Sequence, residues 1–402
     1  MSSIVFGKTT RIVCVNTMKH PAAKGNYEEL EAKLLMLSYL GYIKCVEHNG
    51  LCMFTYTQKT VNDKAWSVYT LVSRGLIVDR KAKKIVAYTM PKFFNYGEDD
   101  GSEAFGGMPF TISEKMDGSM GTVFQNQIGQ WQVATKGSFT SDQAKWGTKF
   151  LYEEGLHEKL EDGHTYIVEL IYPENRIVVN YGAMLGMVLL TSYGPDGEEY
   201  PDVSIEGFFQ LPDHTKSYVS ERDIIDKCKT LDKDTEGFVV RYTNGTRVKF
   251  KGDEYCRIHH VLSHVTPLGI WNMLREDDNI KTTRDQLPEE YQKDFDAITE
   301  LIWDQYDDVI RNINGLVGLT QNMTDKEVGL QFKKWTLQKS NANKEYFPFV
   351  FAVRKHEFYQ QITIPCRARD KLFNLFRPGN NVLPGYSPSV IMNRFTPKEA
   401  TV

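Results

Sequence analysis

Residues 109–126 read PFTISEKMDGSMGTVFQN, in which two apolar runs flank the polar segment Lys-Met-Asp-Gly. Apolar runs bounded by Gly and Asp are typical of strands joined by a tight turn. The pattern predicts that Lys115 stands at the end of a strand, above that turn. A lysine there can act as a nucleophile if its pKa is depressed, or it can be one charge of an ordinary surface hairpin.

Short β-rich runs surround this segment, from about residue 43 to residue 250, and Gly, Asn and Asp turns separate them. We therefore expect an N-terminal α+β domain, built on antiparallel sheets with flanking helices. The runs with strand character are CMFTYT (52–57), WSVYTLV (66–72), KKIVAYTM (83–90), PFTISEKM (109–116), GTVFQN (121–126), WQVATKG (131–137), TYIVELIY (165–172), IVVNYG (177–182), MVLLTSY (187–193), GFVVRYT (237–243) and RVKFKG (247–252).

Three helices are expected within this part of the chain. The first covers about 26–42 and begins with a capping box, because Glu29 follows Asn26 at the required spacing. The other two are insertions between strands, at about 141–162 and 220–231, and Ser220 with Asp223 three residues on is expected to open the second.

Beyond about Tyr255 the pattern becomes helical, which predicts an all-α C-terminal domain. A long helix is expected to begin near Pro288 and to stop at Gly315. A second helix, 324–340, begins with Thr324 at capping-box spacing. The apolar residues on one face of the long helix are Tyr291, Phe295, Ile298, Ile302, Val309 and Ile313. The expected domains are 1–255, the helical 256–380 and an irregular tail, 381–402.

The composition bounds the class of protein. With 402 residues, 25% of them charged and 41% hydrophobic, the chain is long enough for two folded domains. A net charge of −4 excludes a uniformly basic nucleic-acid coat protein, so any nucleic-acid surface must be local. The six cysteines include no Cys-x-x-Cys pair, so we expect reduced thiols and no structural zinc site. No apolar stretch approaches the roughly 20 residues of a membrane helix, and we expect a soluble, cytoplasmic protein.

Lys115 is accompanied by further elements in a fixed order. Together they resemble the covalent nucleotidyltransferases, which comprise RNA ligases, DNA ligases and mRNA capping enzymes, and among these the RNA ligase 1 group of T-even-like bacteriophages. Lys115-x-Asp117-Gly118 resembles the nucleophile motif of that superfamily. The other matching elements are SRGLI (73–77), MPKFFN (90–95), TKGS (135–138), VELI (168–171), NRIV (175–178), EGFVV (236–240) and VKFK (248–251).

This resemblance implies an ATP-dependent RNA ligase with a nucleotidyltransferase (adenylyltransferase) domain at 1–255. It would join RNA 5'-phosphate and 3'-hydroxyl ends through AMP bound to Lys115 and then through an adenylated RNA. The family also suggests tRNA broken in the anticodon loop as substrate, and an end-healing kinase or phosphatase as partner. The residues implied to bind ATP are Arg74, Lys92, Phe94, Glu114, Asp117, Gly118, Lys136, Glu169, Glu236, Lys249 and Lys251. Those implied to hold Mg²⁺, or Mn²⁺ in its place, are Glu236, Glu169 and Asp117.

The residue types suit this chemistry independently of the family. Lys249 and Lys251 alternate with apolar residues, so both ammonium groups face one side of a strand, where they can neutralise an α-phosphate and lower the pKa of Lys115. Arg74 and Lys92 are cations able to grip the leaving pyrophosphate. The alternative is that all four are solvated surface charges.

The carboxylates and aromatic residues also leave alternatives open. Glu169 lies in an apolar run and needs a cationic partner, which can be a catalytic group or Arg176 in a structural ion pair. Asp117 can contact a metal ion or fix the turn that presents Lys115. Phe93 and Phe94 can wall an adenine pocket or simply pack in the core.

Two further functions remain open on the sequence alone: a capping-type nucleotidyltransferase that uses GTP, and an RNA-binding module with an inactive site. His259, His260 and His264 fit no common zinc spacing and are expected on a helix surface or in the core. RNA contact by the C-terminal half is expected, if anywhere, at its basic residues, although a solvated helix face has the same pattern. These are Arg354, Lys355, Arg367, Arg369, Lys371 and Arg377.

Overall fold

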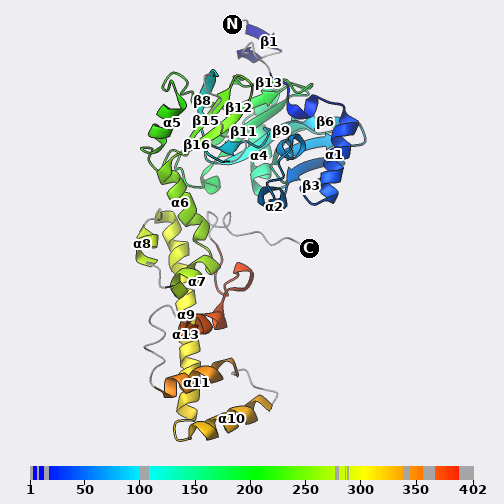
Figure 1. The fold of residues 1–402 in the computed structure, drawn as a ribbon. Coiled ribbons are helices and arrows are strands. Elements are labelled where there is room, and N and C mark those ends of the chain that lie inside the picture. Colours follow the sequence, from blue (N-terminus) through cyan, green and yellow to red (C-terminus); the bar gives the residue numbers. More distant parts are fainter. Residues whose placement is uncertain are drawn as a thin grey trace. The chain divides into compact units, whose positions relative to one another are not determined.

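The computed structural model describes residues 3–6, 9–12, 18–98, 108–276, 280–285, 287, 289–337, 344–355 and 367–388. The chain separates into two compact units, Met1–Cys256 and Arg257–Val402. The first is built on sheets and the second on helices (Figure 1). Within the described ranges, no helix has both the length and the apolar character needed to cross a membrane.

Three sheets and one short ribbon form the first unit. One sheet has the order β3 (Ile43–His48), β4 (Leu51–Tyr56), β5 (Arg74–Asp79), β6 (Lys84–Ala87). The largest has the order β10 (Trp131–Thr135), β9 (Ser119–Gln125), β11 (Thr165–Ile171), β12 (Gly186–Tyr193), β13 (Glu199–Tyr200), with β14 (Phe209–Gln210) beside β12. The third has the order β7 (Phe94–Asn95), β16 (Arg247–Lys251), β15 (Gly237–Tyr242), β8 (Phe110–Glu114). The ribbon pairs β1 (Ser3–Phe6) with β2 (Thr9–Ile12).

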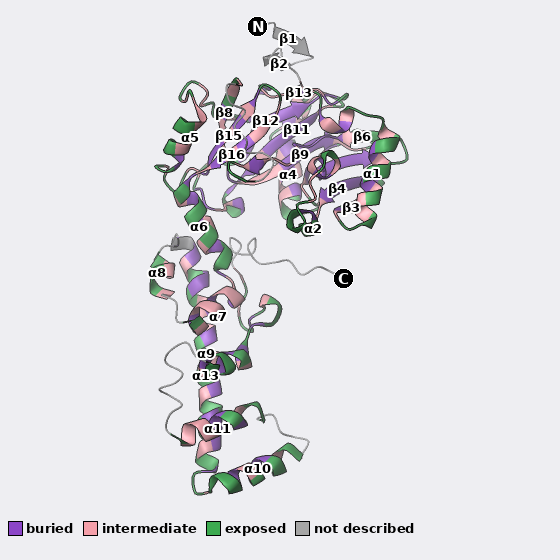
Figure 2. Cartoon of the chain, viewed as in Figure 1, coloured by how far each residue is buried: buried purple, intermediate pink, exposed green. Residues whose placement is uncertain are grey.

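The predicted α+β class, with antiparallel sheets and flanking helices, is confirmed. The pairs β12–β14 and β7–β16 are parallel and each is only two residues long; all the other described strand pairs are antiparallel. Buried side chains concentrate on the strands, whereas α1 (Tyr27–Tyr39) exposes its outer face (Figure 2).

Capping residues explain where the helices of this unit begin. The Asn26 side chain accepts the backbone N–H of Glu29, and α1 packs its buried Leu30 and Leu34 on the side of β3. Ser220 forms a capping box at α5 (Glu221–Cys228), as the sequence predicts. The other helical segments are η1 (Pro21–Ala23), α2 (Gln58–Asn62), α3 (Val68–Val72), α4 (Asp142–Glu153), η2 (Leu156–Lys159) and η3 (Pro173–Asn175).

Two strand predictions are wrong. Of the predicted strand 66–72, residues Val68–Val72 form α3, because Ser67 and Thr70 cap its first turn reciprocally and so satisfy free N–H groups of a helix start. Residues 177–182 form no strand, because the N–H groups of Val178 and Val179 bond to a side-chain carboxylate instead of a neighbouring strand.

The third sheet joins segments that are distant in the chain. Glu114, the last residue of β8, lies opposite Phe238 of β15, and Phe250 of β16 lies opposite Phe238 on the other side. Ile112 and Val240 pack in the apolar core beneath this sheet. The pairing therefore brings the end of β8 beside the start of β15 and the end of β16.

The second unit contains only helices and irregular segments among its described residues, in agreement with the predicted all-α domain. The six apolar residues predicted to share one face of the long helix are all buried in α9 (Glu289–Leu319). The helices are α6 (Asp253–His264), α7 (Pro267–Glu276), α8 (Ile280–Asp285), α9, α10 (Asp325–Leu337), η4 (Lys344–Tyr346), α11 (Phe347–Arg354), α13 (Arg367–Phe373), η5 (Asn374–Phe376) and η6 (Gly379–Asn381).

The predicted helix stop at Gly315 is wrong, because α9 continues to Leu319. A glycine within a helix costs only about 1 kcal/mol. Burial of Leu316 against Val328 and Phe332 of α10 offsets that free-energy cost. The predicted start at Pro288 lies outside the described residues, as do 338–340 of the second predicted helix and 389–402 of the predicted tail.

The buried face of α9 gives a stability prediction. Ile302 is fully buried, and Ile302→Ala should lower the free energy of unfolding of the second unit by about 2–5 kcal/mol through lost burial and a cavity. Leu319→Ala, at a side chain that is 68% exposed, should change it by less than about 0.5 kcal/mol. Thermal unfolding of the full chain, followed by circular dichroism, measures both. Equal effects of the two variants would contradict the assignment of the buried face.

Candidate active site

Lys115 follows β8 directly, and its ammonium group forms an ion pair with Glu236. The Lys115 Nζ lies 2.6 Å from Oε2 of Glu236, and the Lys251 Nζ lies 2.9 Å from the other oxygen, Oε1. The Glu236 side chain is only 3% exposed, whereas that of Lys115 is 22% exposed. One buried carboxylate therefore holds the amine of Lys115 and that of Lys251 at the same place.

The turn after Lys115 is anchored by Asp117. Oδ2 of the Asp117 carboxylate accepts the N–H groups of Val178 (2.8 Å) and Val179 (2.9 Å), and Oδ1 accepts the hydroxyl of Tyr255 (2.8 Å). Burial raises the pKa of Asp117, and these hydrogen bonds oppose the rise. Because three donors occupy its two oxygens, this geometry favours the turn-fixing role over metal contact.

Gly118 permits the close approach of the turn to β11. A Cβ at this position would lie 2.6 Å from the Leu170 carbonyl oxygen, so no other residue fits. The Gly118 N–H instead donates to Oε1 of Glu169, at 3.1 Å. Loss of hydration raises the pKa of Glu169 to about 8, although the nearby Lys115 opposes the rise. Glu169 is therefore poised to gain or lose a proton near neutral pH.

A cavity of about 410 Å³ lies beside Lys115, a size suited to a small-molecule ligand. Its wall includes Lys115 and, of the other predicted ATP-binding residues, Arg74, Glu114, Glu169, Lys249 and Lys251. Apolar and sulfur-containing side chains form much of the rest: Met90, Phe93, Ile112, Met116, Met120, Leu189, Leu190, Val203, Leu211 and Val239.

Lys249 has a strongly depressed pKa. Burial, and then the positive charges of Lys92, Lys115 and Arg74, lower the pKa of Lys249 to about 7. The sequence interpretation assigned a lowered pKa to Lys115 through Lys249 and Lys251. In the structure, Lys115 has the compensating charge of Glu236 at hydrogen-bond distance.

The predicted pyrophosphate cations surround the aromatic pair. Arg74 and Lys249 both lie over the ring of Phe93, at 5.6 and 5.3 Å from its centroid. Lys92 lies 3.8 Å from the ring centroid of Phe94. Burial lowers the pKa of both Arg74 and Lys92, so their charges favour an anionic partner.

Six of the predicted ATP-binding residues lie outside the wall of the 410 Å³ cavity: Asp117, Gly118 and Glu236, whose contacts are given above, and Lys92, Phe94 and Lys136. Lys92 and Phe94 instead line a neighbouring cavity of about 270 Å³, where Phe94 packs edge-on against Trp66. The Lys136 ammonium lies 3.7 Å from the ring centroid of Tyr56. Phe93, the alternative aromatic wall, does line the larger cavity.

A charged cluster beside this cavity was not predicted from the sequence: Arg241 and Arg247 line the 410 Å³ cavity, and Glu199 lines the neighbouring one. Glu199 forms ion pairs with Arg241, at 3.0 Å, and with Arg247. Although burial opposes ionisation, these two arginines hold the pKa of Glu199 below its usual value. The sequence did indicate one member of this cluster, because Arg247 alternates with Lys249 and Lys251 along β16 and so shares their face.

The basic residues of the second unit have mixed surroundings. Arg354 donates to Asp325 and to the carbonyl oxygens of Thr320 and Met323, which ties α11 to the loop before α10. Arg369 is buried and donates to the Leu274 carbonyl oxygen. These two arginines therefore have structural roles, whereas Lys355, Arg367 and Lys371 are all exposed.

His259, His260 and His264, which fit no common zinc spacing, lie on α6. His260 and His264 are exposed, and a ring nitrogen of His264 lies 2.7 Å from the His260 carbonyl oxygen, one turn away. They lie on the helix surface, as the sequence predicts.

Comparisons with known proteins agree with the geometry. Residues 72–255 match the model of a family described as RNA ligase. A protein of Thermovibrio ammonificans assigned as an RNA ligase is 26% identical over 211 residues, covering 48% of this chain and 54% of that protein. A protein of Autographa californica nuclear polyhedrosis virus assigned as a bifunctional polynucleotide kinase/RNA ligase is 26% identical over 212 residues, covering 46% and 30%. The chain thus spans about half of the first relative's length and less than a third of the second's.

Among solved structures, an archaeal ATP-dependent RNA ligase aligns with 71% of this chain and 79% of its own, at 13% identity and a TM-score of 0.38.

The donors around Asp117 give a second prediction. Asp117→Ala leaves two backbone N–H groups and the Tyr255 hydroxyl without their acceptor, and should cost about 2–4 kcal/mol of unfolding free energy. Asp117→Asn should cost about 1 kcal/mol or less, because its amide oxygen can still accept both N–H groups. Denaturant unfolding, with Asp63→Ala as an exposed control, measures this. An asparagine variant as unstable as the alanine variant would show that charge holds the turn.

The depressed pKa of Lys249 gives a pH prediction. Below pH 7 the buried Lys249 ammonium group is charged in the folded protein, and its burial then lowers the free energy of unfolding by the full amount. Between pH 7 and about 10 only the unfolded state binds that proton, so wild-type stability rises with pH. Lys249→Met should therefore be more stable than wild type by on the order of 3 kcal/mol below pH 7, with a difference that shrinks towards pH 10.

Unfolding midpoints at pH 6.5, 8 and 9.5 measure that difference. Lys145→Met, at an exposed position on α4, is the matched control and should show no such trend. A pH-independent difference for Lys249→Met would mean that Lys249 does not titrate in this range.

Proposed function

We propose that this chain is an ATP-dependent RNA ligase that attaches AMP to Lys115 and then joins RNA 5'-phosphate and 3'-hydroxyl ends. The match of residues 72–255 to the model of the RNA ligase family supports this proposal. The observation that carries the proposal is the Lys115 ammonium, held by Glu236 at the wall of a cavity that Arg74, Lys249 and Lys251 also line. A nucleophile, a nucleotide-sized cavity and phosphate-binding cations are the parts that adenylyl transfer requires.

In the first step, the Lys115 amine attacks the α-phosphorus of ATP. A P–N bond forms, the bond from the α-phosphorus to the bridging oxygen breaks, and pyrophosphate leaves. Lys115 must first give up its ion pair with Glu236 and lose a proton, since only the neutral amine has a free electron pair. AMP then passes to an RNA 5'-phosphate, and a 3'-hydroxyl oxygen finally displaces AMP.

The cations of the wall suit the phosphates of ATP. Lys251 lies next to Lys115 through their shared carboxylate, which is the place for the α-phosphate. Lys249 and Arg74 lie over Phe93, and their depressed pKa values mean that an incoming phosphate would stabilise their charged forms. Lys92 and Lys136 lie within electrostatic range of one another, and we propose that they help to hold the leaving pyrophosphate.

The apolar part of the wall suits a nucleoside. We propose that adenine packs among side chains such as Phe93 and Val239, with Glu114 beside it. Phe94 would not contact the nucleoside but would position the Lys92 ammonium group, which lies over its ring.

A divalent cation fits two of the three carboxylates. Glu236 and Asp117 each raise the pKa of Glu169, and a group of mutually repelling carboxylates is stabilised by a cation. We propose that Glu236 and Glu169 hold Mg²⁺ or Mn²⁺, while the engaged Asp117 fixes the turn. A bound ion would offset the charge that grows on the phosphate oxygens during transfer.

The second unit is proposed to select the RNA. We assign adenylyl transfer to residues 1–255 and RNA specificity to the helical residues 256–380, where exposed Lys355 and Lys371 remain available to phosphates. A broken tRNA is the proposed natural substrate. One relative is assigned as both a polynucleotide kinase and a ligase, which supports an end-healing partner for this chain.

Covalent labelling tests the proposal. Protein freed of bound AMP is incubated with Mg²⁺ and ATP labelled at the α-phosphate, then denatured. Wild type and the exposed control Lys145→Ala should carry acid-labile label, whereas Lys115→Ala should lose it by more than about 1,000-fold. Labelled protein mixed with single-stranded RNA that has 5'-phosphate and 3'-hydroxyl ends should then release AMP and give a joined product.

Other outcomes would identify the rival functions. Label from GTP but not from ATP would indicate a capping-type enzyme. AMP-free wild type that takes no label but retains RNA would indicate a binding module with an inactive site.

A further inference from the structure

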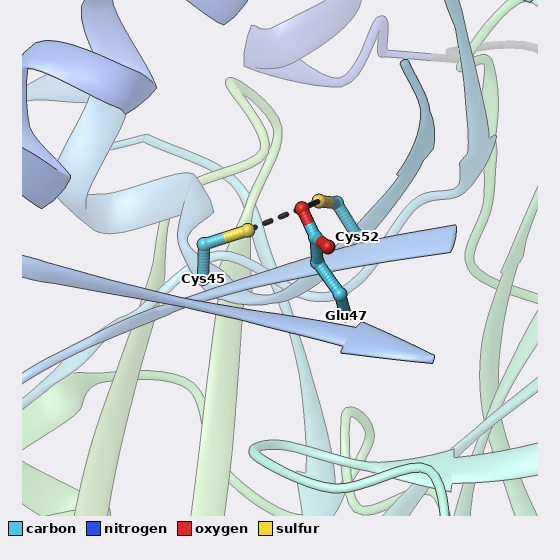
Figure 3. Close-up of side chains that lie close together, drawn as sticks. All are labelled: Cys45, Glu47 and Cys52. Carbon is cyan, nitrogen blue, oxygen red and sulfur yellow. Dashed lines mark hydrogen bonds between the residues drawn. The ribbon is translucent and has the colours of Figure 1, made fainter. Parts of the chain in front are cut away.

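Two thiols and a carboxylate meet on the hairpin β3–β4, although the cysteines are seven positions apart in the sequence. Glu47 pairs directly with Cys52, and Cys45 pairs with Phe54, so Cys45, Glu47 and Cys52 share one face of the hairpin. The two sulfur atoms are 3.0 Å apart, and the Cys52 sulfur lies 3.6 Å from Oε1 of Glu47. The three side chains converge in Figure 3.

We propose that Cys45, Glu47 and Cys52 form a binding site for a thiophilic divalent cation such as Zn²⁺, with a fourth position open to water. All three ligand atoms lie within 4.8 Å of one another. Tetrahedral zinc, with bonds of about 2.3 Å to sulfur and about 2.0 Å to oxygen, separates two sulfurs by about 3.8 Å and a sulfur from an oxygen by about 3.5 Å. The observed 3.6 Å matches, and the sulfur pair has to open by roughly 0.8 Å.

The surrounding charges suit an occupied site. Two thiolates and one carboxylate exceed the charge of a divalent ion by one negative charge. Arg80 lies beside them, with its Nη1 3.6 Å from Glu47. A second bond, from Nε of Arg80 to Glu31 at 2.7 Å, keeps the guanidinium at this place. Arg80 therefore balances the excess charge without occupying the ligand positions.

Tyr27 provides a second, independent observation. Its hydroxyl oxygen is buried and has no hydrogen-bond partner among the described residues. The ring packs in the same apolar cluster as Cys52. Burial raises the pKa of Tyr27, and the neighbouring charges of Glu31 and Cys52 contribute to the rise. A buried O–H without an acceptor is costly, and a thiolate at the metal site would supply that acceptor.

Protonation links the site to pH. A cysteine thiol has an ordinary pKa of about 8.5, so both thiols keep their protons at neutral pH without an ion. Binding a divalent ion then forms two metal–sulfur bonds and releases two protons to water. The affinity should consequently rise by about 100-fold per pH unit near neutral pH.

The register disfavours a disulfide as the alternative. Cys45 and Cys52 are diagonal rather than directly opposite, and diagonal neighbours have Cα atoms about 7–8 Å apart, beyond the usual span of a disulfide. None of the three residues lines either cavity described above, so the proposed metal site is independent of the proposed ligase function.

Spectroscopy with cobalt tests the site in the full chain. The protein is reduced, stripped of metal with a chelator and titrated with Co²⁺. One equivalent should give sulfur-to-cobalt charge-transfer absorption and the visible bands of tetrahedral cobalt, and Zn²⁺ should abolish both by displacement. Cys45→Ser should remove the charge-transfer signal. Cys256→Ser, at an exposed cysteine outside the hairpin, is the matched control and should leave it unchanged.

Glu47→Gln keeps both thiols, and the variant should fold normally because the Glu47 side chain is 73% exposed. It should weaken Zn²⁺ binding by at least about 10-fold. Absence of the charge-transfer signal in wild type would overturn the proposal, as would its survival in Cys45→Ser. A wild-type mass two hydrogens lower, with two thiols fewer by thiol titration, would assign the pair to a disulfide instead.

Discussion

The active-site region depends on one buried carboxylate. Glu236 is almost inaccessible to water, and each of its oxygens pairs with a different lysine, Lys115 and Lys251. Without it, these two ammonium groups would face each other beside Lys249, whose pKa is already depressed by its positive neighbours. The negative charge of Glu236 therefore offsets the repulsion between these lysines when no phosphate is bound. In the reaction that we propose, this ion pair has to open before the Lys115 amine can attack.

The sequence predicted those features that depend on residues close to one another in the chain. The caps at Asn26 and Ser220 were visible because a polar side chain and its N–H partner lie within three residues. The face of α9 was visible because helical periodicity repeats every few residues. Lys115 could be singled out because its short motif was accompanied by other motifs in a fixed order. No single motif would have been sufficient.

Features that depend on distant contacts were not predictable in this way. Residues 177–182 have strand composition, but the carboxylate of Asp117 takes the N–H groups that a strand would have used. Arg241 and Glu199 meet only after the sheets have formed. Likewise, no linear spacing indicates that Cys45 and Cys52 touch, because the turn of a hairpin brings them together. In each case tertiary contacts override composition.

The pairing of β8 with β15 and β16 bears on how the protein is made. Lys115 and Glu236 are 121 positions apart, so the ribosome must synthesise that intervening length before the site can close. At about 5–20 residues per second this takes roughly 6–24 seconds, during which β8 has an unpaired edge. The nascent chain therefore passes through a period in which β8 can pair wrongly with other strands. Chaperones that shield the unpaired strand during this period would therefore favour correct formation of the third sheet.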